Sequence, residues 1–93
     1  MKILERHVEK YFKTAVKKLG GKSYKFSSPS HRGVPDQIAI LPGGEVHFVE
    51  LKRPGGKLSK LQKITLDDLH ALGANTAVLE SMEEVDEWHS QTQ

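Results

Sequence analysis

The feature that most constrains the fold is a pair of apolar runs separated by a Pro-Gly-Gly-Glu turn. The first run covers residues 37–41 and the second covers residues 46–52, which is typical of a β-hairpin. Antiparallel pairing places the start of the first strand beside the end of the second. Asp36 would then lie next to Glu50 and Lys52. Because side chains alternate along a strand, Glu50 and Lys52 would share one face.

The length and composition of the sequence predict one small domain. The 93 residues are 37% hydrophobic and 28% charged, so we expect a single domain over residues 1–93 with one modest core. The absence of cysteine excludes a disulfide framework and a thiolate metal site. No apolar run is long enough for a membrane span, and the first residues lack the core of a signal peptide. We therefore expect a cytoplasmic protein, in the host cytoplasm if a virus or prophage encodes it.

A first helix is predicted by apolar residues that recur at helical spacing from Leu4 to Leu19, before a Gly-Gly pair that ends it. Glu5 is expected to project inside this apolar stripe, whereas Glu9 lies on its flank. A carboxylate on a buried face is costly unless a cation or a hydrogen-bond donor meets it. The alternative is that Glu5 is an ordinary first-turn acid that suits the helix dipole.

The remaining elements follow from turn, cap and periodicity signals. We expect a short strand over residues 23–27, a second helix from the N-cap Ser59 to Gly73, a buried strand over 75–79, and a last helix with a capping box at Ser81. The order α-β-β-β-α-β-α predicts an α/β fold. The strand–helix–strand crossover predicts that the last strand joins a mixed sheet in parallel, with helices on its faces. The expected apolar stripe of the second helix comprises Leu61, Ile64, Leu69 and Leu72.

The acids at the hairpin end suggest metal-assisted phosphodiester chemistry. Two carboxylates, Asp36 and Glu50, can bind a hard divalent cation such as Mg²⁺, and the carbonyl of Leu51 could add a ligand. A bound cation polarises a phosphoryl oxygen and helps to generate hydroxide. Lys52 would stabilise the developing charge or position the attacking water. The alternative is a simple cross-strand salt bridge without catalytic function.

Side chains from the two predicted helices could complete this site. Glu5 or Glu9 could add a metal ligand from the first helix, and Gln62 could hold a water or orient a ligand from the second. A polar, glycine-containing loop before Asp36 and a basic cluster after Lys52 flank the site. These features together favour a catalytic site over a structural ion pair.

The same residues resemble a known nuclease pattern. Gly33-Val34-Pro35-Asp36 followed by Glu50-Leu51-Lys52 resembles the PD-(D/E)XK signature, and the helix start Leu58-Ser59-Lys60-Leu61-Gln62 is similar to the viral-type replication-repair nuclease (VRR-NUC) domain. The resemblance covers nearly the whole chain. It implies a restriction-endonuclease-like mixed central sheet and an endodeoxyribonuclease that depends on Mg²⁺ or Mn²⁺.

The resemblance also implies roles for individual residues. Asp36 and Glu50 match the metal ligands, Lys52 matches the catalytic lysine, and Gln62 matches an accessory catalytic residue. Glu5 and Glu9 both fit the helix-one acid, although the apolar stripe favours Glu5. No small-molecule cofactor beyond the metal is expected.

DNA is the expected partner. The net charge is +2 and the sequence pI is about 8.9, with basic residues near the predicted site. Stand-alone members of the family resemble archaeal junction resolvases, which implies a homodimer that cuts branched DNA such as a Holliday junction during repair. The alternatives are a flap or single-strand nuclease and a non-catalytic DNA-binding module of the same fold. The expected DNA contacts are Lys25, Arg32, Arg53, Lys57 and Lys60.

The expected dimer interface lies on the last helix. Met82, Val85 and Trp88 are its apolar residues, and Trp is favoured at interfaces. The alternative is that Trp88 packs against the sheet of its own chain.

Overall fold

The secondary structure follows the predicted order α-β-β-β-α-β-α. The computed structural model describes residues 2–92, and no helix within them is both long and apolar enough to cross a membrane. The strand boundaries differ from the predictions by one or two residues, so that Lys52 follows the third strand directly. The elements are α1 (Glu5–Lys18), β1 (Lys22–Lys25), β2 (Gln37–Leu41), β3 (Glu45–Leu51), α2 (Lys60–Ala71), β4 (Asn75–Leu79) and α3 (Met82–Gln91).

The four strands form one mixed sheet in the order β1-β2-β3-β4. Strand β2 is antiparallel to both β1 and β3, and β4 is parallel to β3, as the crossover predicts. Gln37 pairs with Val49, so the next residues outward, Asp36 and Glu50, lie across from each other. The Phe26 amide donates a hydrogen bond of 2.9 Å to the carbonyl of Asp36, which extends the β1–β2 ladder to the site.

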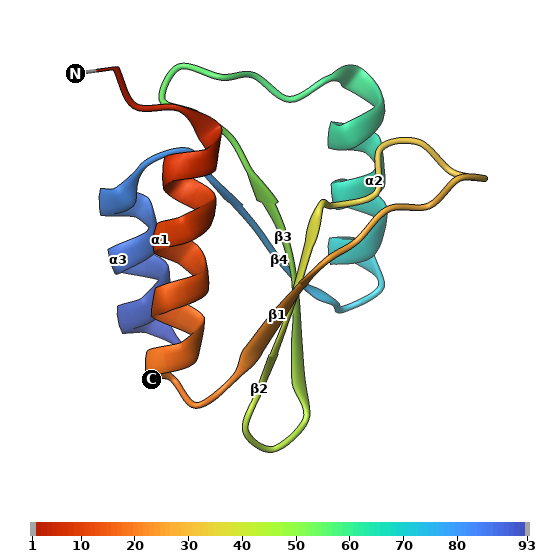
Figure 1. Ribbon diagram of the computed structural model, residues 1–93. Helices are drawn as coiled ribbons and strands as arrows, with labels where there is room; N and C mark the ends of the chain where they lie inside the picture. The colour runs from red at the N-terminus through yellow and green to blue at the C-terminus, as the bar shows by residue number, and fades with distance from the viewer. Residues whose placement is uncertain (1, 93) are drawn as a thin grey trace.

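Helices α1 and α3 cover one face of the sheet, and α2 lies on the other (Figure 1). The core forms on the first face, where the Phe12 and Trp88 rings lie 5.1 Å apart. Trp88 is 6% exposed and Val85 is fully buried, so the prediction that these two residues form a dimer interface is wrong. They pack in the core of their own chain because α3 lies against both α1 and the sheet. The buried core comprises Val8, Phe12, Ala15, Val16, Ala39, Leu41, Val49, Leu51, Leu79, Val85 and Trp88.

Helix α2 uses a different face from the predicted one. Its buried residues are Thr65 and Leu66, whereas Leu61, Ile64 and Leu72 are 42%, 46% and 85% exposed. The helix is rotated so that Gln62 and Leu66, one turn apart, both face the protein. The rotation leaves an apolar strip exposed and brings a polar side chain to the end of β3.

The side-chain caps of α2 and α3 agree in part with the predictions. The hydroxyl of Ser81 accepts the Glu84 amide at 3.0 Å, as expected for an N-cap. The carboxylate of Glu84, however, accepts from the amide of Glu80 rather than from Ser81. The expected capping box on α3 is therefore shifted by one residue. The capping box on α2 is complete.

Candidate active site

The hairpin brings two carboxylates and one ammonium together at one end of the sheet. The amide of Leu51 donates to Oδ1 of Asp36 at 3.2 Å, which fixes that carboxylate against the end of β3. The Lys52 Nζ atom lies 3.7 Å from Oε2 of Glu50. The predicted meeting of Asp36, Glu50 and Lys52 is confirmed in its geometry.

The start of α2 orients Glu50. Oε1 of Gln62 accepts the Ser59 amide at 2.9 Å, and the Gln62 amide donates to the Ser59 hydroxyl at 3.1 Å, completing a reciprocal capping box. The remaining polar atom of this side chain, Nε2, donates to Oε2 of Glu50 at 3.2 Å. One glutamine thus links the helix start to a carboxylate that is only 3% exposed. Gln62 therefore lies at the site, and its accessory catalytic role stays a prediction.

A glycine holds the loop before Asp36 against α2. Gly33 has a φ of +90°, and a Cβ atom on it would lie 2.7 Å from the carbonyl oxygen of Leu61. Both the backbone conformation and the close approach therefore exclude larger residues. Pro35 is fully buried and fixes the direction of the chain into Asp36.

The electrostatics of the acid pair are unfavourable when both groups are charged. Burial, together with the charges of Glu5 and Glu9, raises the pKa of Asp36 from 3.8 to about 6, against the opposing effects of the Leu51 amide and Lys52. Burial and the neighbouring Asp36 raise the pKa of Glu50 from 4.5 to about 7. Both shifts follow from desolvation and like-charge repulsion that a single lysine does not offset. Such shifts are typical of functional sites.

The helix-one acids lie beside Asp36, but their burial differs from the prediction. Glu5 is exposed, because it begins α1 a full turn before the first fully buried position, Val8. Glu9 is half-buried, and its carboxylate lies 3.4 Å from the Lys25 Nζ atom and 3.8 Å from that of Lys13. The placement of Glu5 inside the buried stripe was therefore wrong. The charge of Glu5 nevertheless raises the pKa of Asp36 more than the charge of Glu9 does.

The donors at this site fit a hydrated Mg²⁺ or Mn²⁺ ion. Such ions are held by one or two carboxylates, with water and phosphate oxygens in the other positions. Within residues 2–92, Oε1 of Glu50 is buried without a hydrogen-bond partner. The described chain contains no group of three or more His, Cys, Asp or Glu side chains able to hold a metal ion. An ion between Asp36 and Glu50 would therefore depend on water and substrate oxygens to complete its shell.

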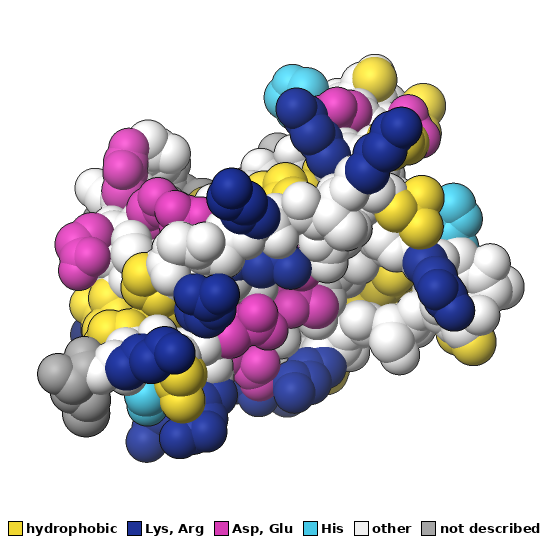
Figure 2. Space-filling model, turned by 90° about the horizontal axis from the view of Figure 1, so that it is seen from above, with side chains coloured by type: hydrophobic (Ala, Val, Ile, Leu, Met, Phe, Trp, Pro, Cys, Tyr) yellow, Lys and Arg dark blue, Asp and Glu magenta, His cyan; other side chains and the backbone are white. Residues whose placement is uncertain are grey.

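Basic side chains surround the acids. Figure 2 shows acidic groups near the middle of the face seen from above, with Lys and Arg side chains around them. The five predicted DNA contacts are all exposed, and Lys25 reaches the site through its ion pair with Glu9. This distribution gives an acidic centre inside a basic rim. The exposed candidates are Lys25, Arg32, Arg53, Lys57 and Lys60.

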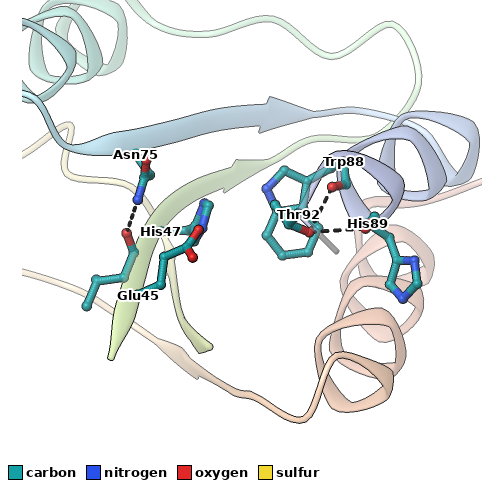
Figure 3. Close-up of polar contacts among 7 residues, drawn as sticks. Glu45, His47, Asn75, Trp88, His89 and Thr92 are labelled. Atoms are coloured by element: carbon teal, nitrogen blue, oxygen red, sulfur yellow. Dashed lines mark hydrogen bonds and ion pairs between the residues drawn. The ribbon is translucent and has the colours of Figure 1, made fainter. Parts of the chain in front are cut away.

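The opposite end of the sheet carries a separate polar cluster, shown in Figure 3. His47 lies 2.6 Å from Oε1 of Glu45, and its ring meets the ring of Trp88 edge-on at 5.6 Å. The Asn75 side chain donates to the carbonyl of Val46 at 3.0 Å. These residues lie near the β2–β3 turn, at the far end of β3 from Glu50. We assign them a structural role in joining β3, β4 and α3.

One buried residue at the site was missed by the sequence reasoning. Gln37 directly follows Asp36, is fully buried, and has no hydrogen-bond partner for either side-chain atom within residues 2–92. The only sequence signal was a polar residue at a strand position whose alternate neighbours, Ala39 and Leu41, are apolar.

Comparison with known proteins gives the family. Residues 3–83 match the VRR-NUC domain family. The chain belongs to the VRR-NUC domain family. A protein of Acyrthosiphon pisum secondary endosymbiont phage 1, named "Putative nuclease p44", is 44% identical over 81 residues, which are 87% of this chain and 87% of the phage protein. The predicted family membership is confirmed.

A solved VRR-NUC domain supports the same conclusion at the level of the fold. Its structure superimposes with a TM-score of 0.89 and 33% sequence identity, covering 96% of this chain and 97% of the solved one. The predicted α/β fold with a mixed central sheet is therefore confirmed. Membership in this family and the phage relative support a nuclease.

Proposed function

We propose that this VRR-NUC protein is an endodeoxyribonuclease that uses Mg²⁺ or Mn²⁺ to hydrolyse phosphodiester bonds in branched DNA. The observation that carries the proposal is the convergence of Asp36, Glu50 and Lys52 at one end of the hairpin, with Lys52 3.7 Å from Glu50. A buried ion pair alone would leave the second carboxylate uncompensated, as the raised pKa values of both acids indicate.

Each residue has a distinct role in the proposed reaction. Asp36, Glu50 and the carbonyl of Leu51 would hold the cation, which supplies Lewis-acid polarisation of the phosphate when bound. Lys52 would orient the attacking water and stabilise negative charge on the phosphoryl oxygens. Gln62 keeps one oxygen of Glu50 occupied by a hydrogen bond, so that Oε1, which has no partner within residues 2–92, would be available to a cation.

The basic rim supports DNA as the substrate. Lys and Arg side chains that contact phosphates provide most of the affinity of non-specific DNA binding, which falls as salt rises. The exposed Arg53 follows Lys52 directly, Lys57 lies in the loop after it, and Lys60 begins α2, so the rim is close in the chain to Lys52. We expect cleavage to weaken with rising salt through these contacts.

We further propose that the active form is a homodimer that resolves four-way junctions. A junction has approximate two-fold symmetry, and two matched incisions require two related sites, which a symmetric pair of subunits supplies. Because Trp88 and Val85 are buried, the interface needs other apolar side chains. Tyr24, Ile40 and Val46 are 53%, 41% and 37% exposed, and their register places all three on the sheet face that α2 covers only in part.

The test is cleavage of labelled four-way junction, flap, single-stranded and duplex DNA, with and without chelator. We expect paired incisions in the junction that require Mg²⁺ or Mn²⁺. Asp36→Asn and Lys52→Ala should abolish cleavage and leave a folded protein. Undiminished cleavage after complete chelation would contradict the metal mechanism. Cleavage restricted to flaps or single strands would replace the junction with those substrates, and DNA binding without any cleavage would indicate a non-catalytic module.

A further inference from the structure

Two buried amide atoms beside the candidate active site lack hydrogen-bond partners among the described residues. Gln37 is fully buried, and neither Oε1 nor Nε2 has a hydrogen-bond partner within residues 2–92. Buried polar groups in native proteins are nearly always satisfied, by protein or by ordered water. An amide with both ends unsatisfied is therefore an indication that it binds something other than protein atoms.

The position of Gln37 identifies what it faces. Gln37 is the first residue of β2 and pairs with Lys25 of β1, so the two side chains lie on the sheet face that α1 covers. Both line a pocket of about 240 Å³ that also contacts Asp36 and the helix-one acids Glu5 and Glu9. This volume has room for several water molecules.

The charges around this pocket favour a hydrated cation. Three carboxylates line it, and Lys25 compensates one of them through its 3.4 Å contact with Glu9. Asp36 belongs both to this pocket and to the acid pair, so water held here lies next to the proposed cation. A side-chain amide offers such water one acceptor and two donors.

We propose that Gln37 is a positioning residue that anchors ordered water between Asp36 and the helix-one acids, and thereby fixes the hydration shell of the divalent cation. This inference rests on the proposed metal-dependent function. Gln37 contacts neither substrate nor cation, and it acts through water on the side of the cation that faces α1. Replacing a residue that supports a metal site without binding the metal typically changes metal affinity or activity by about 10- to 100-fold.

The test compares Gln37→Met, which keeps the length of the side chain but removes its polar atoms, with Thr65→Val. Thr65 is the matched control, because its Oγ1 atom is also buried without a hydrogen-bond partner in residues 2–92, yet Thr65 does not line the pocket. Mn²⁺ affinity is measured by calorimetry without DNA, and unfolding is measured in chelator. We expect Gln37→Met to bind Mn²⁺ at least about tenfold more weakly than wild type while unfolding at no lower temperature. Thr65→Val should bind Mn²⁺ as wild type does.

A third variant separates this inference from the proposed function. If Asp36→Asn binds Mn²⁺ as tightly as wild type does, the proposed metal site at Asp36 is wrong. If Asp36→Asn loses binding but Gln37→Met keeps wild-type affinity, only the role of Gln37 is overturned. A crystal structure of the wild type with Ca²⁺ tests the inference even if Gln37→Met does not fold. It should show ordered water on both amide atoms, and an amide enclosed by apolar atoms alone would overturn the proposal.

Discussion

Replacing Glu50 with glutamine should stabilise the metal-free protein at alkaline pH but not at acidic pH, where Glu50 is already protonated. The folded protein raises the pKa of Glu50 from 4.5 to about 7, so its protonated form is favoured by folding. The resulting stability is fully present below about pH 4.5 and is lost as pH rises through about 7. Above pH 7 the charged Glu50 therefore destabilises the fold, and glutamine removes that charge.

The magnitude follows from the shift and the local hydrogen bonds. A shift of this size corresponds to about 3 kcal/mol at 1.36 kcal/mol per pKa unit. The new amide nitrogen would replace Oε1 of Glu50, which has no partner within residues 2–92, and an unsatisfied donor costs about 1–2 kcal/mol. We expect a net gain of roughly 1–2 kcal/mol at pH 8, or about 5–10 °C in Tm.

The assay is thermal or urea unfolding in chelator from pH 5 to pH 8. Wild type should lose stability as pH rises over this range, and Glu50→Gln should lose less. Some loss should remain in the variant, because Asp36, with its pKa raised to about 6, still titrates. Glu87→Gln is the control, since Glu87 is exposed on α3, and it should stay within about 0.5 kcal/mol of wild type at every pH. Parallel curves for wild type and Glu50→Gln would refute the electrostatic reasoning.

Three further predictions concern the helices and the open sheet face. Glu5→Gln should lower cleavage about tenfold more than Glu9→Gln, because Glu9 is ion-paired to lysines. Single-turnover rates in the opposite order would show that Glu9 is the helix-one acid that acts on the site. Gln62→Ala should weaken Mn²⁺ binding by about 10-fold or more and destabilise α2 by about 1 kcal/mol, measured by calorimetry and urea unfolding; unchanged Mn²⁺ affinity would exclude its role in orienting Glu50. Ile40→Lys should give a monomer by light scattering at micromolar concentration, whereas Leu72→Lys, at the C-cap of α2 and 85% exposed, should not. Dimers of both variants would exclude the open sheet face.

The sequence predicts the hairpin and its acids because both depend on local rules. A tight turn fixes the register of two antiparallel strands, and alternation then fixes the face of each side chain. The positions of Asp36, Glu50 and Lys52 follow without information from the rest of the chain. The mixed sheet follows similarly from the crossover between β3 and β4.

The rotation of a helix depends on neighbours that periodicity alone does not identify. The stripe predicted for α2 included Leu61 and Ile64, but both are exposed, because the capping box and the contact of Gln62 with Glu50 fix the helix start. Trp88 was assigned to an interface because composition favours it there, whereas packing with Phe12 buries it. Gln37 gave only the signal of a polar residue in an apolar strand, since an amide without hydrogen-bond partners among the described residues is visible only when its surroundings are known.

Because Gln62 bonds both the α2 cap and Glu50, fraying of the first turn of α2 should also disorder the Glu50 side chain. When the first turn of α2 opens, Gln62 loses the amide of Ser59 and can no longer hold Glu50. The hydrogen-exchange rate of the Gln62 amide, which is bonded to the Ser59 hydroxyl, therefore reports on the order of the Glu50 carboxylate. An added charge on this hydroxyl, such as a phosphate, would disturb both structures at once, although Ser59 itself makes no contact with Glu50 among the described hydrogen bonds.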